Sequence, residues 1–325
     1  MRTPLLAGLV MVLVAGCGGS AGSAGSAGGP PGAPAEPQPS WTSCSAVGAP
    51  VPLPDLNPAE SLQLPRLGAD FEPTAVVVCR LEPDKRADGA TDLVAAESRA
   101  DGPDDVAAVL DAVRLPDERR TTGACTADLP GVPWFALVDA DGRWVRPGTP
   151  ADACGKIRIE VRRAVENLTL VRVSARPVRE LESSGAAATG CTQNWADVVW
   201  VTGQHRTDAS PPTGEDPFPS AAALRVCVYR VPPAERGGGK PTGTFERGSE
   251  LPAQRRPALA AALKQTTAAP ACTTPASLFA LVRPADDTAG TLYVELDGCQ
   301  RVVVETGTDA GRLGRAHATL VALFS

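Results

Sequence analysis

Nine cysteines divide the chain into one isolated residue and two groups of four, and this division limits what the chain can fold into. Cys17 is the isolated one. The groups are Cys44, Cys79, Cys125 and Cys154, then Cys191, Cys227, Cys272 and Cys299. Successive separations are 35, 46 and 29 residues in the first group and 36, 45 and 27 in the second. This near-identity predicts a tandem duplication of one four-cysteine module.

Residues 1–17 have the pattern of a secretion signal. Arg2 supplies the positive start, residues 5–14 form the apolar run, and Val-Ala-Gly-Cys at 14–17 resembles the lipobox of bacterial lipoproteins. The resemblance implies cleavage before Cys17 and a thioether-linked diacylglycerol on it, which would hold the chain on the extracytoplasmic face of the cell membrane. An uncleaved anchor is the alternative, but the apolar run is well short of the roughly 20 residues that cross a bilayer.

Residues 18–40 consist mainly of Gly, Ser, Ala and Pro. Such a stretch has no apolar face whose burial could offset its ordering entropy, so it is predicted to be a flexible tether. The rest of the chain is long enough for two domains of ordinary size. We expect four-cysteine domains at residues 41–181 and 189–325, with a boundary in the small-residue segment 183–188, which has nothing to pack.

The two predicted domains show the same order of elements. A β-branched strand is expected around the second cysteine, then an apolar-periodic helix, a strand after the third cysteine and a closing helix. In the first and second half these are strands 76–81 and 224–229, helices 104–113 and 257–264, strands 134–138 and 278–282, and helices 157–168 and 312–324. Asp141-Gly142 favours a hairpin after residue 138. The pattern predicts an α+β fold of two tandem, duplicated, disulfide-stapled domains, each a small, mainly antiparallel sheet with packed helices.

Short motifs around the cysteines add a resemblance. They are Cys79-Arg80, Asp141-Gly142, Asp-Ala-Cys-Gly-Lys at 152–156 and Asp-Gly-Cys at 297–299. With these motifs the chain resembles a broad group of uncharacterised secreted and lipid-anchored proteins of actinobacteria. The second half departs from the pattern at Cys227, which no arginine follows. The resemblance implies an envelope location and carries no activity.

The eight paired cysteines are expected to form structural disulfides, since secreted cysteines in even number favour them and no Cys-x-x-Cys motif is present. Four cysteines in a domain permit three pairings, and loop entropy does not separate them. Geometry favours Cys125 with Cys154 and Cys272 with Cys299, because each pair brackets a hairpin. The remaining pairs, Cys44 with Cys79 and Cys191 with Cys227, follow by elimination.

A search for catalytic and metal-binding residues gives none that we would assign. The only histidines, His205 and His317, have no counterpart in the first half. Asp139 and Asp141 could ligate calcium, yet further oxygen ligands at the spacing of a calcium loop are missing, and a turn explains them better. We therefore expect no cofactor and no enzyme activity, with the alternative of a site built from scattered acids and arginines.

The formal net charge of −6 makes nucleic acid an unexpected partner, because phosphate backbones require a basic surface. The favoured hypothesis is a non-enzymatic, membrane-anchored module that binds an envelope protein or a cell-wall component. A passive structural or assembly component is the alternative. Tryptophan is enriched at binding hot spots, although it also fills cores. The tryptophans considered as contact residues are Trp134, Trp144, Trp195 and Trp200.

Overall fold

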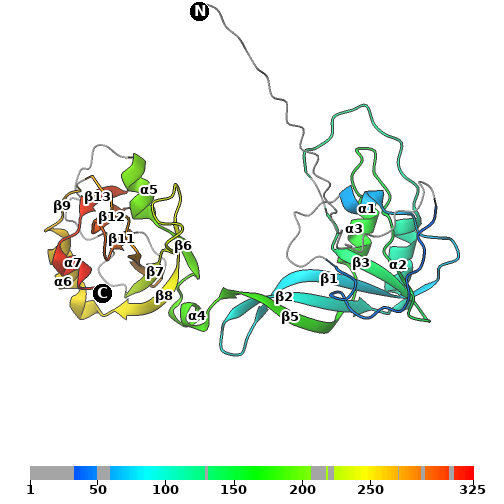
Figure 1. Cartoon of the computed structure of the whole chain (residues 1–325), viewed down its shortest axis with the longest axis horizontal. Coiled ribbons are helices and arrows are strands. Elements are labelled where there is room, and N and C mark those ends of the chain that lie inside the picture. Colours follow the sequence, from blue (N-terminus) through cyan, green and yellow to red (C-terminus); the bar gives the residue numbers. More distant parts are fainter. Residues whose placement is uncertain are drawn as a thin grey trace, which may run out of the picture.

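The computed structural model shows an α+β fold with two antiparallel sheets (Figure 1). It describes residues 33–49, 59–128, 131–205, 217–218, 223–269, 271–286, 290–306 and 311–325. The predicted secretion signal, Cys17 and the tether up to residue 32 lie outside these ranges.

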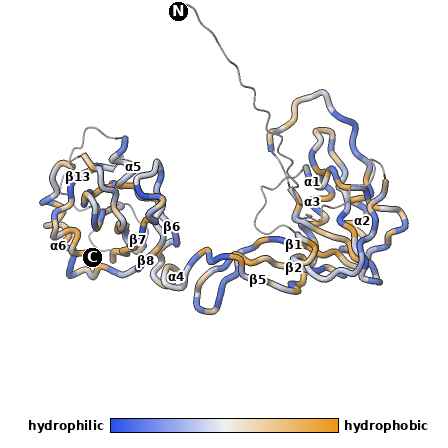
Figure 2. Tube along the Cα trace, in the orientation of Figure 1, coloured by the Kyte–Doolittle hydropathy of each residue, from blue (hydrophilic) through white to orange (hydrophobic). Residues whose placement is uncertain are grey.

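The first sheet has the strand order β4-β3-β1-β2-β5, with antiparallel neighbours throughout. Its strands are β1 (Pro73–Lys85), β2 (Thr91–Ala100), β3 (Trp134–Asp139), β4 (Trp144–Val145) and β5 (Val171–Glu182). The middle of β1 is buried on both faces, which explains its run of consecutive valines, Val76 to Val78. Figure 2 shows the change from this apolar stretch to the hydrophilic turn between β1 and β2.

Helices cover one face of the first sheet. They are α1 (Ala59–Gln63), α2 (Pro103–Arg114) and α3 (Ile159–Glu166). Helix α2 begins at a proline followed by two acids, which suits a helix N-terminus, and it ends just before Pro116. Its buried residues Val106, Val109 and Val113 pack with Val161 of α3 against the sheet. The helices predicted at 104–113 and 157–168 are therefore confirmed.

The second sheet has the order β6-β8-β7-β10-β11-β12-β13-β9, again with antiparallel neighbours. Its strands are β6 (Asn194–Ala196), β7 (Leu224–Arg230), β8 (Thr242–Leu251), β9 (Thr267–Ala268), β10 (Leu278–Pro284), β11 (Thr291–Glu295), β12 (Arg301–Glu305) and β13 (Arg312–Arg315). The strands predicted at 224–229 and 278–282 are thus present.

Both faces of the second sheet are covered. The helical segments are α4 (Ser184–Thr189), α5 (Val198–His205), the 3₁₀ turn η1 (Ala253–Arg255), α6 (Arg256–Leu263) and α7 (Ala318–Val321). On one face, Leu259 of α6 and Leu320 of α7 join the larger apolar cluster. On the other face, Val199 of α5 packs with Tyr229 and Phe279. The central strands are therefore shielded from solvent on both faces, by α6 and α7 on one side and by α5 on the other.

The two sheets share a run of strands in the same order: β2-β1-β3-β4 in the first and β8-β7-β10-β11 in the second. The strands 134–138 and 278–282 are nevertheless not equivalent residue by residue. Phe135 faces the helices of its sheet, whereas Phe279 faces the disulfide side. Cys79 lies opposite Trp134, the first residue of β3, but Cys227 lies opposite Leu281, which is three residues after the start of β10. An odd shift in register exchanges the two faces of a strand.

Four disulfides have the pairing that the hairpin argument favours. They are Cys44–Cys79, Cys125–Cys154, Cys191–Cys227 and Cys272–Cys299, with Cα–Cα distances of 5.7 to 5.9 Å. Such bonds indicate an oxidising, extracytoplasmic compartment. In the described ranges, none of the helices has the length and apolar character to cross a membrane.

Two local predictions are wrong. Segment 183–188 is not a bare linker: the Ser183 side chain accepts a hydrogen bond from the Ala186 amide, Ala186 is buried, and Gly190 ends α4 in a left-handed conformation. The closing helix expected at 312–324 is also wrong for most of its length. Arg312–Arg315 forms strand β13 instead, and the helix that follows has only four residues. Leu313 lies opposite Val303 of β12 and is buried in the same apolar cluster, which favours a strand at this position.

Reduction should open the disulfides in a fixed order, because thiol exchange needs access to sulfur. Cys125 is exposed, whereas Cys191 and Cys227 are each only 3% exposed. Graded reductant, alkylation and peptide mapping should therefore find Cys125–Cys154 reduced before Cys191–Cys227. Alkylation of Cys191 ahead of Cys125 would contradict this prediction.

Candidate functional site

Three tryptophans form a cluster on the face of the first sheet opposite its helices. Trp41, Trp134 and Trp144 contact one another, with ring centroids 5.4 Å apart for Trp41–Trp144, 6.1 Å for Trp41–Trp134 and 6.2 Å for Trp134–Trp144. These distances are in the range of favourable aromatic pairs. All three side chains keep part of their surface exposed. We call this group the tryptophan cluster.

The segment that carries Trp41 is held to the sheet by two neighbouring residues. Cys79 on β1 and Glu97 on β2 lie directly opposite each other. Cys79 bonds covalently to Cys44, while the buried Glu97 carboxylate accepts the Cys44 amide at 2.8 Å and the Trp41 indole N–H at 3.1 Å. One carboxylate therefore satisfies a backbone and a side-chain donor from the same segment, which fixes the Trp41 ring.

The hairpin between β3 and β4 positions the other side of the cluster. Asp139 is buried, and its carboxylate accepts the backbone amides of Asp141 and Arg143, so the turn predicted at 139–142 is confirmed. Gln38 and Trp144 exchange two backbone hydrogen bonds, and the Trp41 amide donates to the Gly142 carbonyl. The incoming chain therefore runs along the edge of β4 before it reaches Trp41.

A charged pair borders the tryptophan cluster. The Arg146 guanidinium lies 5.3 Å from the centroid of the Trp134 ring, a cation–π arrangement. Arg146 also donates to Glu60 at 2.7 Å and lowers the pKa of that carboxyl through this hydrogen bond. Trp41 and Trp144 also pack against the buried Val77 and Val138, so the cluster combines core contacts with ring surface that stays partly exposed beside an ordered cation.

Sequence reasoning named Trp134 and Trp144 but missed Trp41. The sequence points to Trp41 only indirectly. Trp41 precedes Cys44 by three residues, and Cys44 is bonded to Cys79, which lies opposite Trp134. A correct disulfide pairing and strand register together would have placed Trp41 there.

The other two tryptophans named from the sequence belong to the second sheet. Trp195 packs partly buried against the apolar cluster around Tyr229. Trp200 donates its indole N–H to the Gly238 carbonyl at 2.9 Å, and the Arg301 guanidinium lies 5.4 Å from its ring centroid. These contacts give Trp200 a packing role on α5.

The two histidines considered from the sequence lie at the ends of separate helices. His317 caps α7 by accepting the Thr319 amide, and His205 lies exposed at the end of α5. Within the described ranges, no group of three or more His, Cys, Asp or Glu residues is arranged to hold a metal ion.

A buried charged group underlies α5 in the second sheet. Glu295 is 0% exposed and Arg301 is 3% exposed, and their side chains form a fully buried ion pair with Nη2–Oε1 at 2.6 Å. Asp197, 1% exposed, accepts the Trp200 amide at 3.0 Å at the start of α5. Burial raises the pKa of Asp197 to about 6, and the nearby Glu295 carboxylate adds to the rise.

With this geometry in view, the comparisons with known proteins give no further assignment. The chain matches no protein-family model, no curated protein and no solved structure. Its function must therefore be inferred from its own residues.

The raised pKa of Asp197 predicts a pH dependence of stability. Its folded-state pKa of about 6 exceeds the ordinary pKa of 3.8. The contribution of Asp197 to the free energy of unfolding is therefore complete below about pH 3.8 and is lost as the pH rises through 6. The difference between the two pKa values corresponds to about 3 kcal/mol of stability. Asp197→Asn keeps a helix-capping side chain and removes this loss. Urea unfolding should therefore show the variant gaining stability over wild type between pH 4 and pH 8.

The exposed Asp111 provides a matched control, because Asp111→Asn should not change the pH profile of unfolding. Parallel profiles for wild type and Asp197→Asn would show that Asp197 is not penalised by burial.

Proposed function

We propose that this chain is a lipid-anchored, extracytoplasmic binding module of the cell envelope, and that the tryptophan cluster is its contact surface for an envelope protein or a cell-wall component. The observation that carries the proposal is the cluster itself: three partly exposed tryptophan rings in mutual contact, of which Trp41 is held in place by a disulfide and a buried carboxylate. Rigid aromatic surface of this kind is typical of binding hot spots, since little side-chain freedom is lost on contact.

The position of the cluster along the chain supports an envelope partner. The last part of the predicted tether is not a free coil, because Ala35 donates to the Arg66 carbonyl and Gln38 is paired with Trp144. The part that precedes the described residues, 18–32, would have a root-mean-square reach of roughly 20 Å as a coil. A partner at the cluster would therefore lie close to the membrane surface. The shared strand order of the two sheets supports the further proposal that the halves arose by duplication.

The contact role is tested by in-cell crosslinking and recovery of partners with Trp134→Leu, which removes an indole but retains apolar volume. A hot-spot tryptophan contributes about 2 kcal/mol or more, so recovery of a specific partner should fall by about 30-fold. Trp200→Leu is the matched control, because it removes a partly exposed indole from α5, which packs on the other sheet.

Peptide mapping of the four disulfides in each variant separates loss of contact from loss of fold. If Trp134→Leu, correctly bonded, recovers the same partners at the wild-type level, the cluster is not the contact surface.

Membrane attachment is tested separately by Cys17→Ser. Two acyl chains give stable anchoring, whereas the acidic chain has no net attraction to anionic lipid. The variant should move from the membrane fraction to the medium or the soluble envelope fraction. Retention of Cys17→Ser in the membrane fraction would exclude Cys17 as the sole anchor.

A further inference from the structure

The outer ends of β1, β2 and β5 form a three-stranded ribbon that extends beyond the helices of the first sheet (Figure 1). Side chains alternate between the two faces of a strand, and residues directly opposite each other on neighbouring strands share a face. Val77 of β1 packs with the tryptophan cluster, whereas Val76 and Val78 pack with the helices. The register of the three strands therefore assigns their charged side chains to one face or the other.

On the face shared with the helices, arginines pair with acids. Arg172 of β5 reaches across β2 to Glu82 and Asp84 of β1, with its Nη1 at 2.9 Å from an Asp84 oxygen. Arg80 pairs with the same Glu82 at 2.7 Å. Further ion pairs at the turn end of the ribbon join four residues, Arg86, Asp88, Asp92 and Glu180. The charges on this side of the ribbon are thus neutralised within the protein.

The opposite face carries four cations without an acidic partner. They are Lys85 of β1, Arg99 of β2, and Arg176 and Arg179 of β5, and we call them the cationic face. Arg99 is half-buried and the other three are exposed. Among the residues that the structure describes, their side chains form no ion pair and no hydrogen bond.

Two acids share the cationic face but do not neutralise it. The buried Glu97 carboxylate already accepts the Trp41 indole N–H and the Cys44 amide. Glu182 lies at the far end of β5, opposite Thr91. The face therefore keeps an excess of positive charge, although the formal net charge of the chain is −6.

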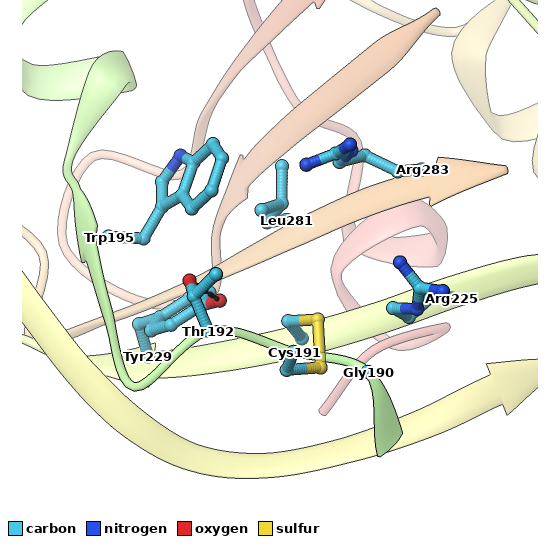
Figure 3. Close-up of a pocket in the computed structure, with 9 residues that line it drawn as sticks. Gly190, Cys191, Thr192, Trp195, Arg225, Tyr229, Leu281 and Arg283 are labelled. Atoms are coloured by element: carbon cyan, nitrogen blue, oxygen red, sulfur yellow. Dashed lines mark hydrogen bonds between the residues drawn. A yellow bond between two sulfur atoms is a disulfide. The ribbon is translucent and has the colours of Figure 1, made fainter. Parts of the chain in front are cut away.

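The arginines beside the Cys191–Cys227 disulfide of the second sheet differ from these cations (Figure 3). The Arg283 guanidinium lies 5.7 Å from the centroid of the Trp195 ring, and Arg225 donates to the Ala285 carbonyl at 2.9 Å. Both arginines are therefore engaged within the protein. The cationic face of the first sheet is the better candidate for an external partner.

The spacing of the cations matches an extended peptide. Measured along β2, the levels of Arg99, Arg176, Arg179 and Lys85 fall at residues 99, 95, 93 and 91, in steps of four, two and two residues. At roughly 3.3 Å per residue these steps are about 13, 7 and 7 Å. Side chains on one face of an extended chain recur every two residues, or about every 7 Å. A strand-like segment with acids at alternate positions can therefore place them opposite the cations.

Apolar side chains accompany the cations. Leu81 and the exposed Pro83 of β1 lie on the same face. Val171, which is paired with Arg99, is 67% exposed, and Val173 is 59% exposed. These valines are two of the three large hydrophobic side chains exposed in the described part of the chain. A peptide with acidic and apolar side chains can use both kinds of surface, whereas a polyphosphate or similar polymer uses only the charge.

The outer edge of β5 is unsuited to the addition of another strand. β5 ends the strand order of its sheet, but Pro177 has no amide hydrogen, and the pairing of β5 with β2 shifts register at three places. Proline and bulges are devices that protect an exposed edge. A partner is therefore expected to lie on the cationic face through its side chains and not to extend the sheet.

We propose that the cationic face binds an extended, acidic peptide segment of a partner protein. Carboxylates of the segment pair with Arg99, Arg176 and Arg179, and an apolar side chain contacts Val171. A single exposed ion pair contributes little, so binding requires several pairs at once. The proposal does not depend on the contact role of the tryptophan cluster, because these residues lie on β2 and β5 outside it.

The test uses the complete extracytoplasmic chain and a fluorescein-labelled peptide, Glu-Ser-Val-Ser-Glu-Ser-Glu-Ser-Glu, whose acids have the spacing of the cations. Fluorescence anisotropy should show saturable binding that weakens as salt rises from about 0.05 M to about 0.5 M, since salt screens exposed charges. The same peptide with Gln in place of every Glu should not bind. Equal binding of the two peptides would overturn the proposal.

Arginine variants assign the binding to this face. Combining Arg99→Gln, Arg176→Gln and Arg179→Gln should weaken binding by about tenfold or more, because three exposed charge pairs are lost. A control with the same change in net charge combines Arg119→Gln, Arg255→Gln and Arg312→Gln, three exposed arginines outside the cationic face. The control should bind within about twofold of wild type, and equal affinities of the two triple variants would overturn the proposal.

Photocrosslinking of the wild type gives a measurement that does not depend on folding of a variant. A benzophenone in place of the peptide's valine should label residues of β2 or β5, as mapped by mass spectrometry. Labelling confined to other elements would overturn the proposal. Polyphosphate is the competitor for the other class of partner: tighter binding per charge than the acidic peptide would assign the face to an anionic polymer and overturn the peptide assignment.

Discussion

The Cys44–Cys79 disulfide and the adjacent Glu97 carboxylate hold residues 41–44 on the face of the first sheet that its helices leave uncovered. The helices α2 and α3 cover only one face of that sheet. The other face is covered by a short incoming segment that has no helix or strand of its own to hold it in place. Because Cys79 and Glu97 are cross-strand neighbours, a covalent bond and two hydrogen bonds converge on residues 41–44. The tryptophan cluster is the result.

The second sheet achieves the same coverage by a different arrangement. A disulfide again fixes the segment that precedes its central strand, Cys191 to Cys227, but α5 adds a helix over this face. That helix lies above the buried Glu295–Arg301 ion pair. Breaking a buried pair leaves an uncompensated charge, so Arg301 and Glu295 are expected to be mutually dependent. On this sheet α5 packs over the disulfide face, whereas on the first sheet that face carries the partly exposed tryptophan cluster.

The apolar patterns of the segments were enough to predict the fold class. Two disulfide pairs, Cys125–Cys154 and Cys272–Cys299, were predicted because a hairpin brings its flanking cysteines together, and the other two pairs followed by elimination. Strand register was not predictable, since a shift of an odd number of residues changes which face carries Phe135 or Phe279 without changing the local pattern. Trp41 was missed for the same reason.

The most direct measurement is the indole ¹H–¹⁵N spectrum of Cys44→Ala with Cys79→Ala, compared with wild type and with Cys272→Ala plus Cys299→Ala. If the disulfide holds the tryptophan cluster together, the signals of Trp41, Trp134 and Trp144 should shift or broaden in the first variant only, while far-ultraviolet circular dichroism stays unchanged. Unchanged indole signals in a protein that lacks the Cys44–Cys79 bond would contradict the central role given to it.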